Sequence, residues 1–239
     1  MSHTRPVTTT AASIPTPDGD LPVRLWLPAA GTGPGIVLCQ EIFGISSYVE
    51  RRAADLAALG YVVAAPEFYW RLGATSVPDG PDMLEQGMAL AQQVDWEAAV
   101  ADGVAAYRWL GEQPQASGKV GLVGFCWGGG LAFNIAAQID PACLVSYYGS
   151  ALPSLLELAP RVTCPSLHHF GDADSFIDRP TVERIREAVA AGGQAEFFTY
   201  PEADHAFDNP DFDNFHPEAA QIAWGLTESF LSRTLPTGS

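Results

Sequence analysis

One cysteine in this chain has the surroundings that turn a thiol into a nucleophile. Cys126 lies in the run GFCWG at residues 124–128, directly after an apolar strand-like segment and directly before helical sequence. The spacing is that of the G-x-S-x-G elbow with cysteine in place of serine. Small flanking residues let strand and helix pass closely around a strained turn, which lifts the sulfur above the sheet. The helix N-terminus then favours a thiolate, and the N–H of Trp127 can stabilise a developing oxyanion.

Two other interpretations fit a glycine-rich turn between a strand and a helix. Cys126 could be a small buried core residue, or the turn could bind phosphate. The phosphate interpretation is disfavoured because the chain has no G-x-x-x-x-G-K-[ST] run and no G-x-G-x-x-G pattern at this strand. The strand–turn–helix context therefore favours the nucleophile elbow.

A base for the thiol is expected in a loop near the end of the sheet. Chains with this elbow carry nucleophile, carboxylate and histidine in that order, each after a successive strand. His205 follows the strand-like segment that ends at Tyr200, which suits general acid–base chemistry. The remaining histidines lie in the N-terminal segment, within a strand or in a loop before the last helix: His3, His168, His169 and His216.

The carboxylate that orients this histidine is less clearly marked. Three aspartates, Asp172, Asp174 and Asp178, follow the strand-like segment 166–170. Asp172 suits an Asx-type turn at the end of that strand. Asp204 adjoins the histidine but lies in the wrong loop for the acid. The residue pattern alone therefore leaves the choice of carboxylate open.

Short apolar runs alternate with helical stretches along the chain. The expected strands are residues 23–27, 36–39, 61–65, 119–123, 144–148, 166–170 and 195–200. The expected helices are residues 48–59, 95–110, a segment beginning after 128, 181–191 and 218–231, with a long loop over 69–82. This alternation predicts a mostly parallel central sheet with helices on both faces. Together with the elbow and the order of its partners, it predicts an α/β-hydrolase fold. We expect one domain over residues 1–239, with about 1–12 as a flexible N-terminal segment.

Composition limits the partners of the chain. It carries 12 Lys and Arg against 28 Asp and Glu, a formal net charge of −16, without a local basic cluster. Such a chain repels phosphate backbones and anionic lipids, so neither nucleic acid nor membrane is expected as a partner. The four scattered cysteines fit neither a zinc site nor a disulfide framework. We expect a cytoplasmic monomer or small homo-oligomer that needs no metal or cofactor.

Together these segments resemble the dienelactone hydrolase (carboxymethylenebutenolidase) family of α/β-hydrolases. The resemblance covers nearly the whole chain, and five segments carry it: QEIFG at 40–44, GFCWGG at 124–129, YYG at 147–149, GDADSFI at 171–177 and EADHAF at 202–207. A cysteine elbow together with QEIFG is far more restrictive than a generic hydrolase motif.

The resemblance assigns roles to individual residues. It implies that Cys126, Asp174 and His205 form the triad, and that the N–H of Ile42 joins that of Trp127 in the oxyanion hole. It further implies that Glu41 lies beside the resting thiol and helps take its proton when substrate arrives. A carboxylate next to a thiol disfavours a second anion, so such a thiol stays protonated until then. The alternative for Glu41 is a structural carboxylate that binds a backbone turn.

The chain departs from the family pattern where substrate binds. The family holds the carboxylate of dienelactone with two arginines, and the aligned positions carry Leu84 and Asn209 here. Arg71, the nearest arginine, has a different place in the pattern. Losing a bidentate guanidinium costs a carboxylate ligand about 2–3 kcal/mol. A neutral substrate is therefore expected, with Arg71 and four apolar residues as candidate contacts, although the four could equally be core: Phe43, Met88, Trp127 and Tyr147.

The predicted function is hydrolysis of a carboxylic ester or enol lactone by a Cys-His-Asp triad through a thioester acyl-enzyme. One alternative is a promiscuous esterase that acts on small activated esters. The other is a non-catalytic binding protein that has kept the fold.

Overall fold

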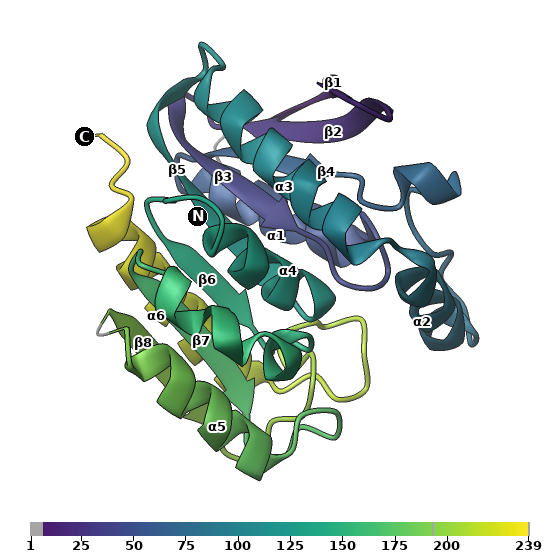
Figure 1. Cartoon of the computed structure of the whole chain (residues 1–239), viewed down its shortest axis with the longest axis vertical. Coiled ribbons are helices and arrows are strands. Elements are labelled where there is room, and N and C mark those ends of the chain that lie inside the picture. The colour runs from purple at the N-terminus through teal and green to yellow at the C-terminus, as the bar shows by residue number, and fades with distance from the viewer. Residues whose placement is uncertain (1–6, 193, 239) are drawn as a thin grey trace, which may run out of the picture. The chain divides into compact units, whose positions relative to one another are not determined.

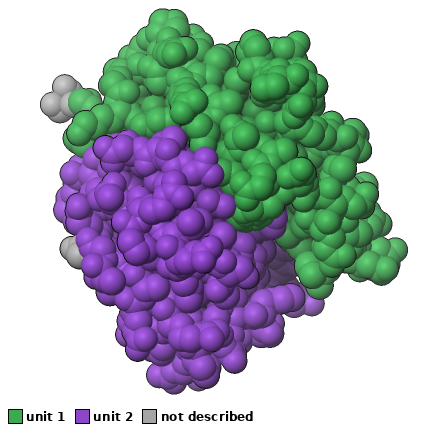
Figure 2. Space-filling view, viewed as in Figure 1, with its two compact units in different colours: residues 1–121, 235–239 green, residues 122–234 purple. Residues whose placement is uncertain are grey.

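The computed structural model describes residues 7–192 and 194–238, and Figure 1 shows the order of its elements. The chain falls into two compact units, coloured separately in Figure 2. Unit 1 contains residues 1–121 and 235–239, and unit 2 contains residues 122–234. Each unit is described below by itself, and the single domain over residues 1–239 stays a prediction.

Unit 1 contains strands in the order β1-β2-β4-β3. The strands are β1 (Thr8–Thr16), β2 (Gly19–Leu27), β3 (Gly33–Cys39) and β4 (Val62–Pro66), and the helices are α1 (Ser47–Ala58), the 3₁₀ helix η1 (Trp70–Leu72), α2 (Met83–Gln93) and α3 (Trp96–Gly111). The β1–β2 and β2–β4 pairs are antiparallel, whereas β3 and β4 are parallel. Ser46 caps α1 by accepting from the N–H of Val49, and Gly60 follows the helix with a positive φ of 107°.

Part of the N-terminal segment that we expect to be flexible, residues 1–12, is a β-strand in the structure. Residues 8–12 belong to β1 and pair in register with residues 23–27 of β2. The β-branched run Thr8–Thr10 favours a strand, and the hairpin through Gly19 supplies its partner. Residues 1–6 of the expected segment lie outside the described residues.

Unit 2 contains parallel strands in the order β5-β6-β7-β8. The strands are β5 (Ala116–Phe125), which crosses the boundary between the units, β6 (Leu144–Tyr147), β7 (Ser166–Gly171) and β8 (Ala195–Tyr200). The helices are α4 (Trp127–Ala136), η2 (Leu152–Ser154), η3 (Leu156–Arg161), α5 (Arg179–Ala190) and α6 (Pro217–Thr234). In Figure 1, α4 and α5 lie in front of these strands and α6 lies behind them.

Strands β6 and β7 are buried along their whole length, as expected for parallel strands that are covered on both faces. Parallel strands bring their carboxyl ends to the same edge of the sheet. The loops after β5, β7 and β8 therefore leave from one edge of unit 2, and these loops carry Cys126, Asp174 and His205. The mostly parallel sheet with helices between its strands confirms the predicted fold class.

Candidate active site

Cys126 occupies the strained turn that the sequence predicts. Its φ of 54° and ψ of −120° lie where non-glycine residues are rare. Cys126 is the single residue between the end of β5 and the start of α4. A Cβ atom on Gly124 would lie 2.1 Å from the carbonyl oxygen of Gly128, so a side chain there would block the turn. The glycine at this position is thus required by the close passage of strand and helix.

A continuous chain of hydrogen bonds links the three residues of the predicted triad. His205 Nε2 lies 3.2 Å from Cys126 Sγ, and His205 Nδ1 lies 2.8 Å from Asp174 Oδ2. Asp174 Oδ1 accepts from the N–H groups of Phe176 and Ile177, both at 2.8 Å. Asp174 is 7% exposed and His205 6%, so the chain is shielded from water. These bonds fix the orientation of the carboxylate and of the imidazole.

Asp172 and Asp178, the two alternatives to Asp174 as the carboxylate of the triad, make other contacts. Asp178 is the N-cap of α5, where its Oδ1 accepts from the N–H of Thr181 at 3.0 Å. Asp172 is only partly buried, and its N–H donates to the carbonyl of Tyr200. Among the three candidates after β7, Asp174 is the one whose carboxylate contacts His205.

The contact between sulfur and imidazole changes the pKa values of both groups. Burial alone would lower the pKa of His205, but the charge of Cys126 and the hydrogen bond to Asp174 raise it to about 10. Burial raises the pKa of Cys126, but the charge and hydrogen bond of His205 outweigh it and the pKa is lowered. Both directions favour a thiolate–imidazolium pair. The resemblance implies a neutral resting thiol instead, and the geometry of unit 2 does not favour that state.

Asp204 connects the loop of the base to the loop of the acid. Its Oδ1 accepts from the N–H of Ser175 at 2.7 Å and from the N–H of His205 at 2.6 Å. A Cβ on Gly171 would lie 2.1 Å from the carbonyl oxygen of Ala203, so the two loops also touch through their backbones. Asp204 therefore has a structural role beside the base, in agreement with its exclusion as the acid.

Three residues near Cys126 and His205 were not singled out by the sequence pattern. The Tyr148 ring lies 4.9 Å from the imidazole, and its hydroxyl donates to buried Asp208 at 2.5 Å. Phe176 is 59% exposed, and its ring lies 5.1 Å from the imidazole of His205. Ser150 places its hydroxyl oxygen 3.8 Å from the Cys126 sulfur. The motif YYG contains Tyr148 and the motif GDADSFI contains Phe176, but nothing in the sequence identifies the serine that follows YYG.

The other histidines of unit 2 have roles in packing and capping. His168 and His169 are both fully buried in β7. His169 bonds Tyr200 at 2.7 Å and Thr227 at 3.1 Å. His216 accepts from the N–H of Ala219 at the start of α6, which is the local role that its position before the helix suggests.

The QEIFG segment is firmly held inside unit 1. The Tyr69 hydroxyl donates to the carbonyl of Ile42 at 2.8 Å, and the N–H of Val77 donates to the carbonyl of Phe43 at 2.9 Å. Gly44 has a φ of 75°, and a Cβ there would lie 2.2 Å from the carbonyl oxygen of Thr75. Glu41 is 1% exposed. The roles of Glu41 and Ile42 toward the thiol stay predictions, as does the oxyanion role of Trp127.

Two of the residues predicted to contact substrate, Tyr147 and Arg71, bind other side chains of the protein instead. Tyr147 is fully buried in β6, where its hydroxyl shares a 2.7 Å hydrogen bond with Thr227 and its ring lies 4.4 Å from that of His169. It is a core residue, because its side chain points into the packed sheet. The Arg71 guanidinium binds Asp102 at 2.5 Å and Asp18 at 2.8 Å, which leaves a substrate-binding role for it without support.

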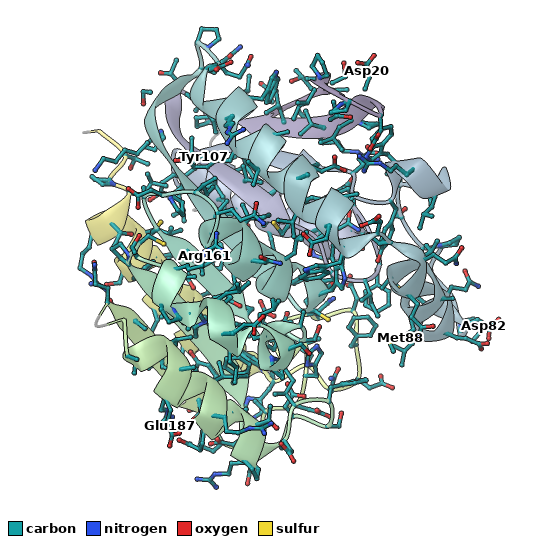
Figure 3. All side chains as sticks on the ribbon, viewed as in Figure 1. Asp20, Asp82, Met88, Tyr107, Arg161 and Glu187 are labelled. Atoms are coloured by element: carbon teal, nitrogen blue, oxygen red, sulfur yellow. The ribbon has the colours of Figure 1, made fainter. Side chains whose placement is uncertain are left out.

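The remaining residues of the predicted binding region are distributed over α2 and the QEIFG segment. Leu84 is 51% exposed and Met88 41%, and Figure 3 labels Met88 on α2. Phe43 is buried and lies against this helix, because a Cβ on Gly87 would be 3.0 Å from its ring. Asn209, the second departure from the family pattern, is buried and accepts from the N–H of Asp211 at 3.0 Å.

Residues 7–192 and 194–238 contain no group of three or more His, Cys, Asp or Glu side chains placed to hold a metal ion. None of their helices is both long and apolar enough to cross a membrane.

Comparison with known proteins gives concordant results. The family model described as "Dienelactone hydrolase family" matches residues 21–235. The carboxymethylenebutenolidase of Pseudomonas sp. strain P51 is 35% identical over 223 residues, which cover 92% of this chain and 93% of that protein. The carboxymethylenebutenolidase of Pseudomonas putida is 38% identical over 209 residues, 86% of this chain and 88% of that protein. A putative dienelactone hydrolase from Klebsiella pneumoniae has a similar structure, with a TM-score of 0.82, 28% identity, and coverage of 95% of this chain and 99% of that one.

Proposed function

Because the chain belongs to the dienelactone hydrolase family, we propose that it hydrolyses a neutral ester or enol lactone through a thioester formed on Cys126. The observation that carries this proposal is the buried chain of hydrogen bonds from the Cys126 sulfur through His205 to Asp174. This arrangement supplies a nucleophile, a base within reach of its proton and a carboxylate that orients the base.

Acylation begins with attack of the Cys126 sulfur on the substrate carbonyl carbon. The carbon–oxygen double bond opens, and the negative charge that develops on oxygen is received by the N–H groups of Trp127 and Ile42. When the carbonyl reforms, the bond to the leaving oxygen breaks, and His205 gives that oxygen a proton. In an enol lactone this oxygen leaves as an enol and becomes a ketone, so ring opening is favourable.

Deacylation returns the cysteine to its starting state. His205 takes a proton from water, and the resulting hydroxide attacks the thioester carbon. Collapse of this second tetrahedral intermediate breaks the carbon–sulfur bond, releases the carboxylic acid and leaves the electron pair on Cys126. The neighbouring imidazolium then stabilises the thiolate. In the gated form that the family resemblance implies, Glu41 would take the thiol proton before attack.

The preference for a neutral substrate rests on the two departures from the family pattern. Leu84 is half exposed on α2 and cannot pair with a carboxylate. Asn209 is 2% exposed and bound to its own loop. The net charge of −16 further disfavours an anionic substrate at long range.

The decisive experiment measures kcat/KM for two enol lactones that differ only by a carboxymethylene group, together with p-nitrophenyl acetate. We expect the neutral lactone to be the better substrate, and Cys126→Ala to abolish turnover of all three. Leu84→Arg should lower KM for the carboxylated lactone by about tenfold, whereas Leu84→Met should not. A wild-type preference for the carboxylated lactone would refute the substrate assignment. Undiminished hydrolysis by Cys126→Ala would refute the mechanism.

A further inference from the structure

The helix behind the nucleophile begins with more glycines than the elbow needs. Residues 128–130 are all glycine, and a Cβ on Gly129 would lie 2.8 Å from Ser146 Oγ and 2.9 Å from the Tyr147 carbonyl oxygen. A Cβ on Gly130 would lie 2.6 Å from Ala151 Cβ. These approaches are closer than real Cβ atoms allow, so side chains on α4 would push away the segment that follows β6.

Because the glycines allow it, residues 147–150 lie directly against the nucleophile turn. The Cys126 N–H donates to the carbonyl of Tyr147 at 3.0 Å, and the Ser150 N–H donates to the carbonyl of Cys126 at 3.1 Å. The backbone of the nucleophile is thus bonded to this segment in both directions. The second bond fixes Ser150 where its side-chain oxygen lies 3.8 Å from the Cys126 sulfur.

We propose that Ser150 is a further catalytic residue whose hydroxyl donates a hydrogen bond to the Cys126 sulfur whenever that sulfur is negatively charged. A hydroxyl hydrogen rotates to suit its acceptor, so the fixed oxygen position is sufficient. His205 contacts the same sulfur at 3.2 Å, so an anionic sulfur has two side-chain donors. Among the described titratable groups of unit 2, His205 contacts the sulfur, and Asp174 and Asp204 contact His205.

The sulfur carries negative charge at two points of the proposed reaction. It is a thiolate before attack, and it receives the electron pair of the carbon–sulfur bond when the thioester is hydrolysed. Losing a hydrogen-bond donor to the sulfur raises the thiol pKa, and this affects attack by the thiolate and hydrolysis of the thioester unequally. A higher thiol pKa reduces the thiolate fraction but makes each thiolate more nucleophilic, whereas it makes the sulfur a poorer leaving group. Loss of the Ser150 hydroxyl is therefore expected to slow deacylation more than acylation. This second step rests on the proposed function, but the contact with the resting thiolate does not.

The test measures alkylation of the full-length protein by iodoacetamide as a function of pH, with modification of Cys126 identified by mass spectrometry. We expect Ser150→Ala to raise the midpoint of Cys126 alkylation by about 0.5–1 pH unit, equivalent to roughly three- to tenfold less thiolate on the acid side. Ser150→Thr retains a hydroxyl and should stay close to wild type. Ser154→Ala, an exposed position in η2, is the matched control and should have no effect.

Two results would overturn the proposal. One is an unchanged midpoint in a Ser150→Ala protein whose melting temperature matches wild type. The other is an equal shift in Ser150→Thr, because loss of the hydroxyl would then not be the cause. A shift in Ser150→Ala without hydrolysis of any ester by wild type would support the contact with the thiolate while refuting the proposed function, so the two failures are distinguishable.

Discussion

Replacing Asp174 with asparagine removes one charge from the hydrogen-bonded chain and leaves its shape. The asparagine oxygen can keep the two backbone bonds that Asp174 Oδ1 accepts at 2.8 Å, which turns the NH₂ group toward His205. Two donors then face each other unless the imidazole carries its proton on Nε2. In that tautomer His205 cannot accept the proton of Cys126. The substitution therefore impairs the base without moving it.

The size of the effect follows from the burial of the pair. Asp174 Oδ2 and His205 Nδ1 are 2.8 Å apart and shielded from solvent, so salt screens their interaction little. A hydrogen bond to a charged group contributes about 1.5–3 kcal/mol, which corresponds to roughly 10- to 150-fold in kcat/KM. The unfavourable tautomer adds to this, and we expect a loss of about 10²–10³-fold. A serine triad loses about 10⁴-fold on the same change, but a thiol is more acidic and depends less on its base.

The assay is hydrolysis of p-nitrophenyl acetate with kcat and KM determined separately. Asp172→Asn is the matched control, because it removes a carboxylate from the same loop. Asp178→Ala removes the side-chain N-cap of α5 and should lower the melting temperature while leaving kcat unchanged. The reasoning is refuted if Asp174→Asn stays within about threefold of wild type, or if Asp172→Asn loses as much activity.

Three further predictions concern stability and the predicted binding residues. Burial lowers the pKa of His168 to about 4 and that of His169 to about 3, while both protonate near 6.5 in the unfolded chain. Urea unfolding should therefore show stability lost as pH falls from about 6.5 toward 4, by up to about 2.7 kcal/mol per pH unit, and His169→Gln should halve that slope. Gly171→Ala should lower the melting temperature sharply because its Cβ meets a carbonyl oxygen at 2.1 Å, whereas Gly225→Ala, with open space on α6, should leave it unchanged or raised. Arg71→Met leaves the carboxylate of Asp102, which is 2% exposed, without its ion pair and should lower stability by about 3 kcal/mol or more; a raised KM with unchanged stability would restore Arg71 as a substrate contact.

The sequence predicts the site best where the chemistry depends on local pattern. The elbow around Cys126 is recognisable because glycine spacing and the change from strand to helix occur within a few residues. His205 is recognisable because it follows a strand in the expected order. The choice of Asp174 over Asp172 depends on which carboxylate faces the imidazole, and the residues alone leave it open. The structure shows that contact at 2.8 Å.

Other features leave no local pattern to detect. Strand β1 is an edge strand with mostly exposed side chains, so it lacks the apolar alternation that marks a half-buried strand. Adjacent residues at the end of β6 have different surroundings: Tyr147 packs in the core, while Tyr148, with a φ of 36°, brings its ring near His205. The YYG motif identifies the pair but not which tyrosine faces the base. Helix α2 contains Gly87 and exposes Leu84 and Met88, so its apolar face is not distinct.

The state of the resting thiol is the point on which the sequence and the structure differ most in chemical terms. The resemblance to the family implies a protonated thiol that Glu41 holds until substrate arrives. The structure of unit 2 brings Sγ within 3.2 Å of the imidazole and a serine hydroxyl within 3.8 Å. Both neighbours stabilise an anion, and the pKa of Cys126 is lowered despite burial. A thiolate formed at rest is exposed to oxidation, whereas a gated thiol is protected. Because the midpoint of Cys126 alkylation measures the thiol pKa directly, the profile proposed for Ser150 also distinguishes these two states: an acidic midpoint in wild type requires the ion pair, and a midpoint near or above that of free cysteine requires the gate.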